Sequence, residues 1–118
     1  MISFNITESG FEIQVTMIEI EDDMLVVIIG GDRPHVGAVT VAQGFEKSNS
    51  RGTVTSISVP GHKEKALIEK PAKILAQETG GTVAVVGGVH YENIGKKGIN
   101  LICELGIRAA ERILQKET

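Results

Sequence analysis

Three histidines, His35, His62 and His90, are the residues of this 118-residue chain best suited to chemistry. An imidazole exchanges protons near neutral pH and binds transition metals, so a small histidine- or metal-dependent enzyme is one hypothesis. A zinc site would have to draw these ligands from three separate segments, because the sequence contains no HxH or HxxxH pair. We therefore rank a metal site below the other possibilities.

A carboxylate lies within three residues of each histidine: Asp32, Glu64 and Glu92. Such a neighbour could orient an imidazole for acid–base work, but this requires a geometry that only the folded chain supplies. An isolated loop histidine is more often solvated or hydrogen-bonded than catalytic. The proximity of these histidines and carboxylates in the sequence therefore assigns no catalytic residue.

The pattern of apolar residues predicts the elements that position these groups. Alternation predicts an N-terminal β-hairpin, with a bulge or strong twist at Met17 and Ile18, where the apolar phase slips. The apolar run from Met24 to Ile29 predicts a central strand covered on both faces. A first helix should end at Gly80, with Pro71 either kinking it or lying one turn from its start. The predicted strands are 2–7, 11–17, 24–29, 36–42, 53–59 and 82–86, and a second helix follows near residue 99 with Gly106 close to the sheet.

This order, βββββαβα, predicts an α+β fold: a mainly antiparallel six-stranded sheet with two helices packed on one face. We expect one parallel pair, between the fifth and sixth strands, and a single domain over residues 1–118. If the first five strands form a meander, segments 30–35, 60–64 and 88–93 share one end of the sheet, which we call the rim. All three histidines are therefore predicted to lie at the rim.

Positive charge is also expected at the rim. Both predicted helices begin there, where their free N–H groups and dipoles favour an anion. Arg33, Lys96 and Lys97 add cationic side chains. The glycine-rich segments 30–32 and 95–98 match neither the P-loop nor the dinucleotide fingerprint, which argues against nucleotide hydrolysis and a Rossmann site.

The overall composition excludes several classes of function. A net charge of −3 and an aromatic content of 3% argue against a nucleic-acid surface. The longest apolar run is too short to cross a bilayer and the N-terminus lacks a signal-peptide pattern, so we expect no membrane partner and no export. The single cysteine, Cys103, is expected to be buried and inert in a reducing compartment, which predicts a cytoplasmic protein.

Three segments carry a resemblance to a known family: LVVIIGGDRPHVGAV at 25–39, PGHKE at 60–64 and GGVHYENI at 87–94. Their most specific element is Gly-Gly-Asp-x-Pro-His-x-Gly-Ala. Together they resemble the LpdD-like family, small proteins associated with gallate decarboxylase systems and described as prenylated-flavin chaperones. The resemblance spans nearly the whole chain.

This resemblance implies a fold similar to that of the proteasome-assembly chaperones, which act as dimers, and hence a homodimer. It also implies a UbiD-type decarboxylase as partner, for which the small protein would hold, deliver or mature the cofactor prenylated FMN. Carried over by motif, the candidate cofactor-binding residues are Asp32, Arg33, His35, His62, His90 and Asn93, and none of them is assigned a catalytic role.

The leading hypothesis is thus a non-catalytic chaperone that handles prenylated FMN or FMN, whose phosphate would meet Arg33 and Lys96 or Lys97 at the rim. Only Tyr91 is available near the rim for stacking on a flavin, so we expect transient or partner-completed binding. The alternatives are the histidine- or metal-dependent enzyme and a protein-assembly chaperone resembling the proteasome-assembly kind, which would use a sheet edge or helix face instead of the rim.

Overall fold

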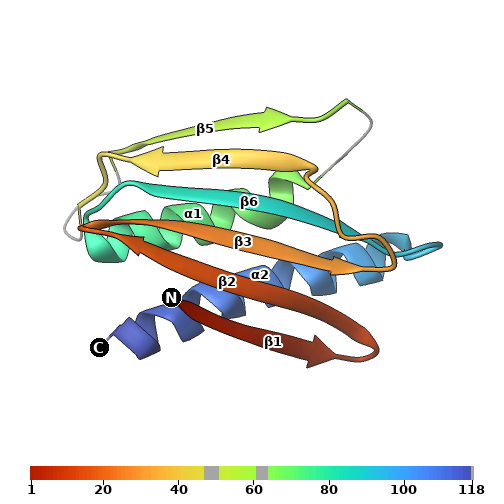
Figure 1. Ribbon diagram of the computed structural model, residues 1–118. Coiled ribbons are helices and arrows are strands. Elements are labelled where there is room, and N and C mark those ends of the chain that lie inside the picture. The colour runs from red at the N-terminus through yellow and green to blue at the C-terminus, as the bar shows by residue number, and fades with distance from the viewer. Residues whose placement is uncertain (47–50, 61–63, 118) are drawn as a thin grey trace.

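Six strands form one mixed sheet, and two helices cover one of its faces in the computed structural model (Figure 1). The structure describes residues 1–46, 51–60 and 64–117. This agrees with the predicted α+β class, the predicted number of strands and the placement of both helices on one face. The elements are β1 (Ile2–Glu8), β2 (Phe11–Ile20), β3 (Asp23–Gly31), β4 (Ala38–Gln43), β5 (Thr53–Ser58), α1 (Lys65–Thr79), β6 (Val83–His90) and α2 (Gly95–Glu117).

The strand order differs from the predicted meander. The order across the sheet is β1-β2-β3-β6-β4-β5, so β6 lies between β3 and β4 and not beside β5. The parallel pair is therefore β3 with β6, while β4 pairs antiparallel with both β6 and β5. The strand directions are nevertheless those predicted, because β3, β5 and β6 all run toward the same end. The rim is consequently preserved even though the predicted neighbour of β6 was wrong.

The predicted bulge in the second strand is absent. Residues of β2 pair without interruption with β3, from Ile13 opposite Gly30 to Ile20 opposite Asp23. The apolar phase slips because the sheet face that bears no helix also carries apolar side chains. Ile18 and Ile20 belong to that outer face and are 37% and 54% exposed.

Strand β3 ends with its Gly-Gly pair, Gly30-Gly31, whereas the Gly87-Gly88 pair, expected to close the sixth strand after Val86, lies inside β6. Strand β6 continues as far as His90. The chain needs glycine here because another segment of backbone approaches closely. Conversely β4 begins at Ala38, two residues later than predicted, since the preceding residues form a connection.

That connection, residues 32–37, crosses the end of β6 to join β3 to β4, and it passes in front of β6 in Figure 1. A Cβ placed on Gly88 would lie 1.6 Å from the carbonyl oxygen of His35, a distance no side chain could tolerate. Backbone hydrogen bonds fasten the crossing at both ends: the Asp32 N–H donates to the His90 carbonyl at 2.6 Å, and the Gly37 N–H donates to the Gly87 carbonyl at 2.8 Å. Glycine at position 88 is therefore a requirement of the topology.

The core lies between the sheet and the two helices. Helix α1 contains Pro71, which lies well inside the helix and not one turn from its start, and ends as predicted at Gly80 with φ 75°. Gly106 of α2 faces α1 and not the sheet, which corrects the prediction: a Cβ there would lie 2.9 Å from the Leu67 carbonyl oxygen. Pro71 has no N–H to donate to that carbonyl, so glycine lets the second helix approach it closely. The largest fully buried side chains include Ile13, Met17, Ile28, Ile68, Leu75, Leu105 and Ile113.

In the described part of the chain, neither helix offers an apolar stretch long enough to cross a bilayer.

The Gly88 crossing generates a test. Gly88→Ala should lower the free energy of unfolding by about 3 kcal/mol, the upper end of the range for overpacking, because the new methyl group meets backbone and not a flexible side chain. Amide hydrogen exchange at Gly37 should also accelerate. Gly10→Ala is the control: it has open space around it, so only its positive φ should cost stability, about 1 kcal/mol, and exchange at Gly37 should not change. Equal effects of the two substitutions would contradict the crossing argument.

Candidate functional site

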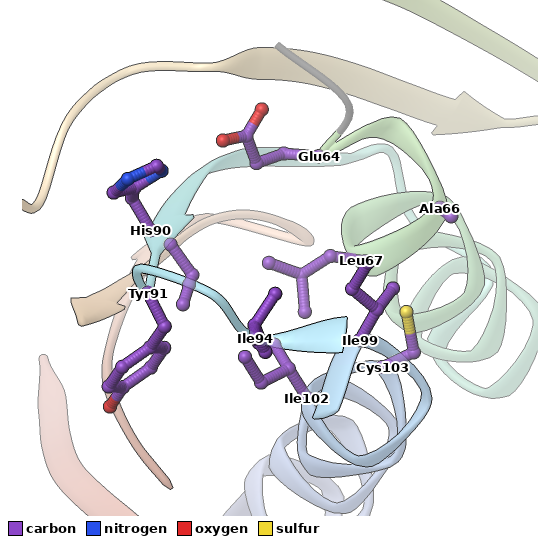
Figure 2. A pocket seen from close by; sticks show the side chains of 10 residues that line it. Glu64, Ala66, Leu67, His90, Tyr91, Ile94, Ile99, Ile102 and Cys103 are labelled. Carbon is purple, nitrogen blue, oxygen red and sulfur yellow. The ribbon is translucent and has the colours of Figure 1, made fainter. Parts of the chain in front are cut away.

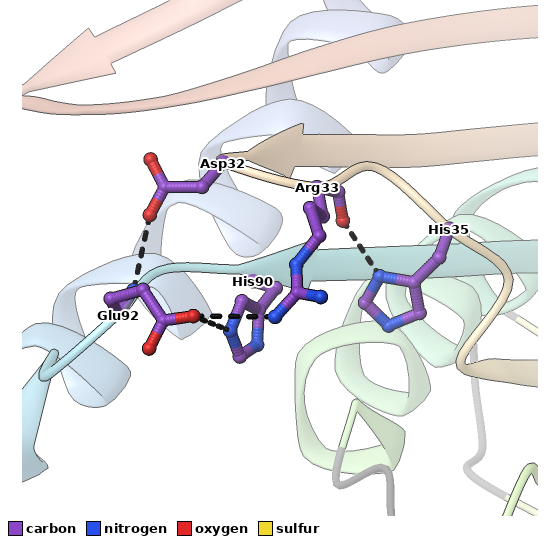
Figure 3. Close-up of polar contacts among 5 residues, drawn as sticks. All are labelled: Asp32, Arg33, His35, His90 and Glu92. Atoms are coloured by element: carbon purple, nitrogen blue, oxygen red, sulfur yellow. Dashed lines mark hydrogen bonds and ion pairs between the residues drawn. The ribbon is translucent and has the colours of Figure 1, made fainter.

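A polar network at the rim joins the crossing segment to the end of β6 (Figure 3). The backbone N–H of Glu92 donates to the Asp32 carboxylate at 3.1 Å. The Glu92 carboxylate in turn accepts hydrogen bonds from Arg33 and from His90 Nε2, each at 3.2 Å. Arg33 and Glu92 remain largely exposed, so this ion pair is screened by water and contributes little to stability. The main effect of the network is to hold the side chains of Arg33, His90 and Glu92 near one another.

A second, more buried pair lies next to this network. His35 Nε2 is 2.7 Å from Glu64 Oε1, and the His35 Nδ1–H donates to the Arg33 carbonyl at 2.8 Å. Glu64, the residue that precedes α1, is only 9% exposed. Gly37 makes room for it, since a Cβ at that position would lie 2.3 Å from Glu64 Oε2. The last glycine of the Gly-Gly-Asp-x-Pro-His-x-Gly-Ala motif therefore makes room for the carboxylate that pairs with the histidine of the same motif.

This geometry favours the charged form of His35. Both ring nitrogens face acceptor oxygens, and only the imidazolium can donate from both. The hydrogen bond to the Arg33 carbonyl is the largest influence and raises the pKa of His35, as do the hydrogen bond and the charge of Glu64. Partial burial and the charge of Arg33 lower the pKa, but they do not cancel the increase.

An apolar pocket opens beside the two polar groups, bounded by the end of β6 and the first turns of α1 and α2 (Figure 2). Its volume is about 270 Å³. Glu64 and His90 stand on one side of it in Figure 2, and isoleucines from the start of α2 stand on the other. Such a pocket accepts an apolar or aromatic group and leaves polar atoms at its edge to orient the remainder of a ligand. Its apolar lining comprises Leu67, Val89, Ile94, Ile99 and Ile102.

Tyr91 and Cys103 also line this pocket, each in a way that limits its role. The Tyr91 ring packs edge-on against Phe11, with centroids 5.0 Å apart, and its hydroxyl donates to the Glu12 carbonyl at 3.0 Å and accepts from the Glu12 N–H at 2.7 Å. Tyr91 is thus held in place by Phe11 and Glu12 and forms a rigid part of the pocket wall. Cys103 is half-buried and not fully buried as predicted, but burial raises the pKa of its thiol against the opposing charge of Lys70. An unreactive thiol is consistent with this environment.

The predicted site residues do not all join one cluster. Asp32, Arg33, His35 and His90 are linked through the contacts above, with Glu92 and Glu64 as the carboxylate partners. Asn93 forms the turn before α2, with φ 52°. Lys97, in the first turn of α2 beside Lys96, lines a separate hollow with Phe11 and Asn100. His62 lies outside the described residues.

No metal site is formed by the residues that the structure describes, since no three histidine, cysteine or carboxylate side chains among them gather as ligands. The proposed three-histidine set includes His62, which falls outside this part of the chain. His35 Nε2 and His90 Nε2 are instead paired with carboxylates, those of Glu64 and Glu92.

Sequence reasoning missed the pocket itself. The stripe of Ile99, Ile102 and Cys103 predicted a helix face packed in the core, yet Ile99 is 51% exposed and the three residues line an open cavity. An apolar stripe has the same spacing whether it faces a core or a ligand. The one available signal was position, because the stripe begins at the rim.

Comparisons with known proteins show one family and one known fold. The family model described as the prenylated flavin chaperone LpdD-like domain matches residues 7–118. Protein LpdD of Lactiplantibacillus plantarum is 31% identical over 101 residues, which cover 84% of this chain and 72% of that protein. A solved structure described as a novel chaperone complex for yeast 20S proteasome assembly has a TM-score of 0.63 at 15% identity, over 98% of this chain and 94% of that one. This last likeness shows the fold alone.

The His35–Glu64 pair generates a pH-dependent prediction. Because the folded state raises the pKa of His35 above its ordinary 6.5, the stabilisation is fully present below pH 6.5 and is lost as pH rises through the folded-state pKa. The unfolding free energy of the natural protein should exceed that of His35→Gln most clearly between about pH 5.5 and 6.5, below the ordinary pKa of histidine. Urea unfolding of both proteins from pH 5.5 to 9 measures this.

The matched control is Glu64→Gln, which keeps the shape of the side chain and removes its charge. Substituting His35 in that background should have a smaller effect at low pH. A stability difference between natural protein and His35→Gln that grows with pH would contradict the assigned pair.

Proposed function

The chain belongs to the LpdD-like prenylated flavin chaperone family, and we propose that it is a non-catalytic factor that binds prenylated FMN, or a related phosphate-bearing cofactor, and delivers it to a UbiD-type decarboxylase. The observation that carries the proposal is the apolar pocket next to a polar rim. Within this proposal the protein works in the cytoplasm, which accords with its free thiol.

The size of the pocket supports holding only part of such a cofactor. Pockets that enclose a drug-sized ligand are typically about 300–1,000 Å³, and this one is about 270 Å³. Aliphatic walls from Leu67, Val89 and the isoleucines suit the hydrocarbon added to a prenylated flavin, while the larger ring system would extend toward the mouth. A ligand left partly outside its carrier can pass to a second protein, as delivery requires.

The charges at the rim suit a weakly held phosphate. Arg33 is paired with Glu92, and His35 is paired with Glu64, so these cations are already offset. Lys96 and Lys97, in the first turn of α2, add positive charge to the start of this helix, although Lys97 lines the separate hollow and neither lysine lines this pocket. A phosphate at the pocket mouth would compete with Glu92 for Arg33, which favours reversible binding over tight retention.

The alternative of a histidine-dependent enzyme receives less support from the geometry. Both ring nitrogens of His35 already have partners, the Arg33 carbonyl and the Glu64 carboxylate. A general base needs a nitrogen that can face a substrate. We therefore assign the pair to positioning the crossing segment against α1. A protein-assembly role remains the other alternative, and the experiment below separates it from cofactor binding.

Cofactor binding is tested by anaerobic titration of the protein with reduced prenylated FMN and with FMN, followed calorimetrically. Ile99→Lys should weaken binding of prenylated FMN about tenfold or more, because it places a charge on the pocket wall at a residue that is 51% exposed and therefore tolerant of substitution. Ile20→Lys is the matched control, since Ile20 is 54% exposed at the opposite end of the sheet.

Delivery is tested by adding the loaded protein to a UbiD-type apo-decarboxylase and measuring recovered holoenzyme. The natural protein and Ile20→Lys should increase that yield, and Ile99→Lys should not. Absence of binding together with no gain in holoenzyme would refute the proposed function. Partner binding without any cofactor binding would favour the protein-assembly alternative instead.

A further inference from the structure

Strand β5 lies at one edge of the sheet, so its backbone has a neighbouring strand on one side only (Figure 1). Pairs in an antiparallel ladder alternate between hydrogen-bonded and non-hydrogen-bonded, so one bond fixes the pattern for the whole strand. The Val59 N–H, just beyond β5, donates to the Gly37 carbonyl at 2.8 Å. Odd-numbered residues of β5 therefore bond to β4. The bond from the Asp32 N–H to the His90 carbonyl gives the same result when it is carried through the register of β6 and β4.

The even-numbered residues of β5 direct their backbone groups to the free edge: Val54, Ser56 and Ser58. Each offers one N–H donor and one C=O acceptor, and alternate residues of a strand are about 6.8 Å apart. Another extended backbone is the group that matches this spacing of donors and acceptors. None of the residues of β5 is charged or is proline, the features that usually protect a sheet edge from pairing. Within residues 1–46, 51–60 and 64–117, β4 is the only strand that pairs with β5.

The opposite edge of the sheet, β1, is protected in a way that β5 is not. The guanidinium of Arg112 in α2 donates to the Asn5 carbonyl at 3.3 Å and so occupies an edge acceptor of β1. A second arginine of α2, Arg108, pairs with Glu8 at the end of β1, with N and O atoms 2.9 Å apart. Charged side chains along an edge are a common means of preventing strand addition. The two edges therefore differ, and β5 is the one suited to accept a further strand.

A carboxylate lies beside the centre of the β5 edge. The Ser56 hydroxyl donates to Glu69 Oε2 of α1 at 2.5 Å, and the hydroxyl of the buried Thr40 lies 2.7 Å from Ser56 Oγ. The Glu69 side chain is still 33% exposed, and its ion pair with Lys65 is long, at 3.9 Å. A strand added at this edge would bring one of its inward side chains next to this accessible carboxylate. Opposite charges stabilise such neighbouring strand positions, which favours lysine or arginine there.

We propose that the β5 edge binds an extended segment of the partner protein as an additional strand, with a cationic side chain of that segment beside Ser56 and Glu69. The proposal rests on the proposed function, which supplies the partner, a UbiD-type decarboxylase. A second copy of the chain is a less suitable occupant, because a two-fold axis near Ser56 would bring two Glu69 carboxylates toward each other.

Strand addition at β5 leaves the pocket accessible. The pocket is lined by the end of β6 and by the first turns of the two helices, and no residue of β5 lines it. The chain can therefore hold its cofactor while its sheet edge is bound to the decarboxylase. Attachment through the sheet edge and release of the cofactor are then separate steps, carried out by different parts of the molecule.

The direct test is residue-resolved amide hydrogen exchange in the full-length protein, alone and with the apo-decarboxylase. In the complex, exchange at Val54, Ser56 and Ser58 should slow about tenfold or more, because these amides gain acceptors. Thr55 and Ile57, which already donate to β4, should change much less. A complex without slowing at the three edge amides, or with slowing at the edge of β1 instead, would overturn the proposal.

A proline at the edge tests the backbone bonds. Ser58→Pro removes one edge N–H and should raise the dissociation constant for the decarboxylase about tenfold. Ser3→Pro is the matched control: both serines are exposed, and Ser3, two residues from Asn5, directs its N–H to the free edge of β1. It should leave the affinity unchanged, and circular dichroism should show that both variants remain folded. Equal effects of the two substitutions would overturn the proposal.

The charge of Glu69 is tested separately. Glu69→Gln keeps the shape of the side chain and should raise the dissociation constant for the decarboxylase up to about fivefold. Glu78→Gln is the control, because it removes the same charge from an exposed residue near the other end of α1. An unchanged affinity in Glu69→Gln would contradict the cationic partner residue and so overturn the proposal in this form.

These outcomes can be distinguished from a failure of the proposed function. Ser58→Pro should bind prenylated FMN as the natural protein does, because the pocket is separate from β5. Normal cofactor binding without any complex with the decarboxylase would overturn strand addition and leave cofactor binding intact. Edge amides whose exchange slows with concentration in the protein alone would also overturn the proposal, by assigning the β5 edge to a second copy of the chain.

Discussion

The passage of residues 32–37 across the end of β6 is the constraint on which the rest of this structure depends. Because β6 inserts between β3 and β4, the link joining those two strands has to cross β6, and it can do so only where the crossed residue has no side chain. Gly88 provides this. The hydrogen bonds from Asp32 to His90 and from Gly37 to Gly87 then hold the link in place. The site is a consequence of this crossing, since it carries Asp32, Arg33 and His35 over the strand that ends in His90.

The crossing leaves the rim with a polar part and an apolar part, which differ in what they contact. The carboxylates of Glu64 and Glu92 engage the cations of the crossing segment and hold it against α1 and β6. The apolar pocket beside these groups stays open. The side chains at the start of α2 that line it are neither wholly packed in the core nor wholly exposed to water. Under the proposed function, this combination of an apolar surface and a few polar groups would hold part of a cofactor and still allow its release, which tight enclosure would oppose.

The two faces of the sheet differ in what covers them. The inner face, with Ile13, Val15 and Val26, forms a core with the helices that stabilises the fold by removing aliphatic surface from water. The outer face carries the same kinds of residue without a covering layer in the described chain. Under the proposed function, cofactor handling would be separate from this outer face, because the pocket is lined by the end of β6 and by the two helices.

The sequence by itself determined the elements and their directions. Period-two alternation, a helical stripe and glycine at position 80 are local features, so six strands and two helices could be predicted, and strand direction alone placed His35 and His90 at one rim. Which strands are neighbours depends on contacts between distant residues, and only the tertiary structure decided that β6 pairs with β3 and β4. The same limit explains two wrong predictions. Gly87 and Gly88 suggested a strand end because the local sequence does not show that another backbone segment crosses there. Met17-Ile18 suggested a bulge because the local sequence does not show that the outer face of the sheet is also apolar. Whether Ile99 and Cys103 face a core or a pocket likewise depended on how closely Gly106 lets α2 approach α1, a packing distance that no sequence pattern contains.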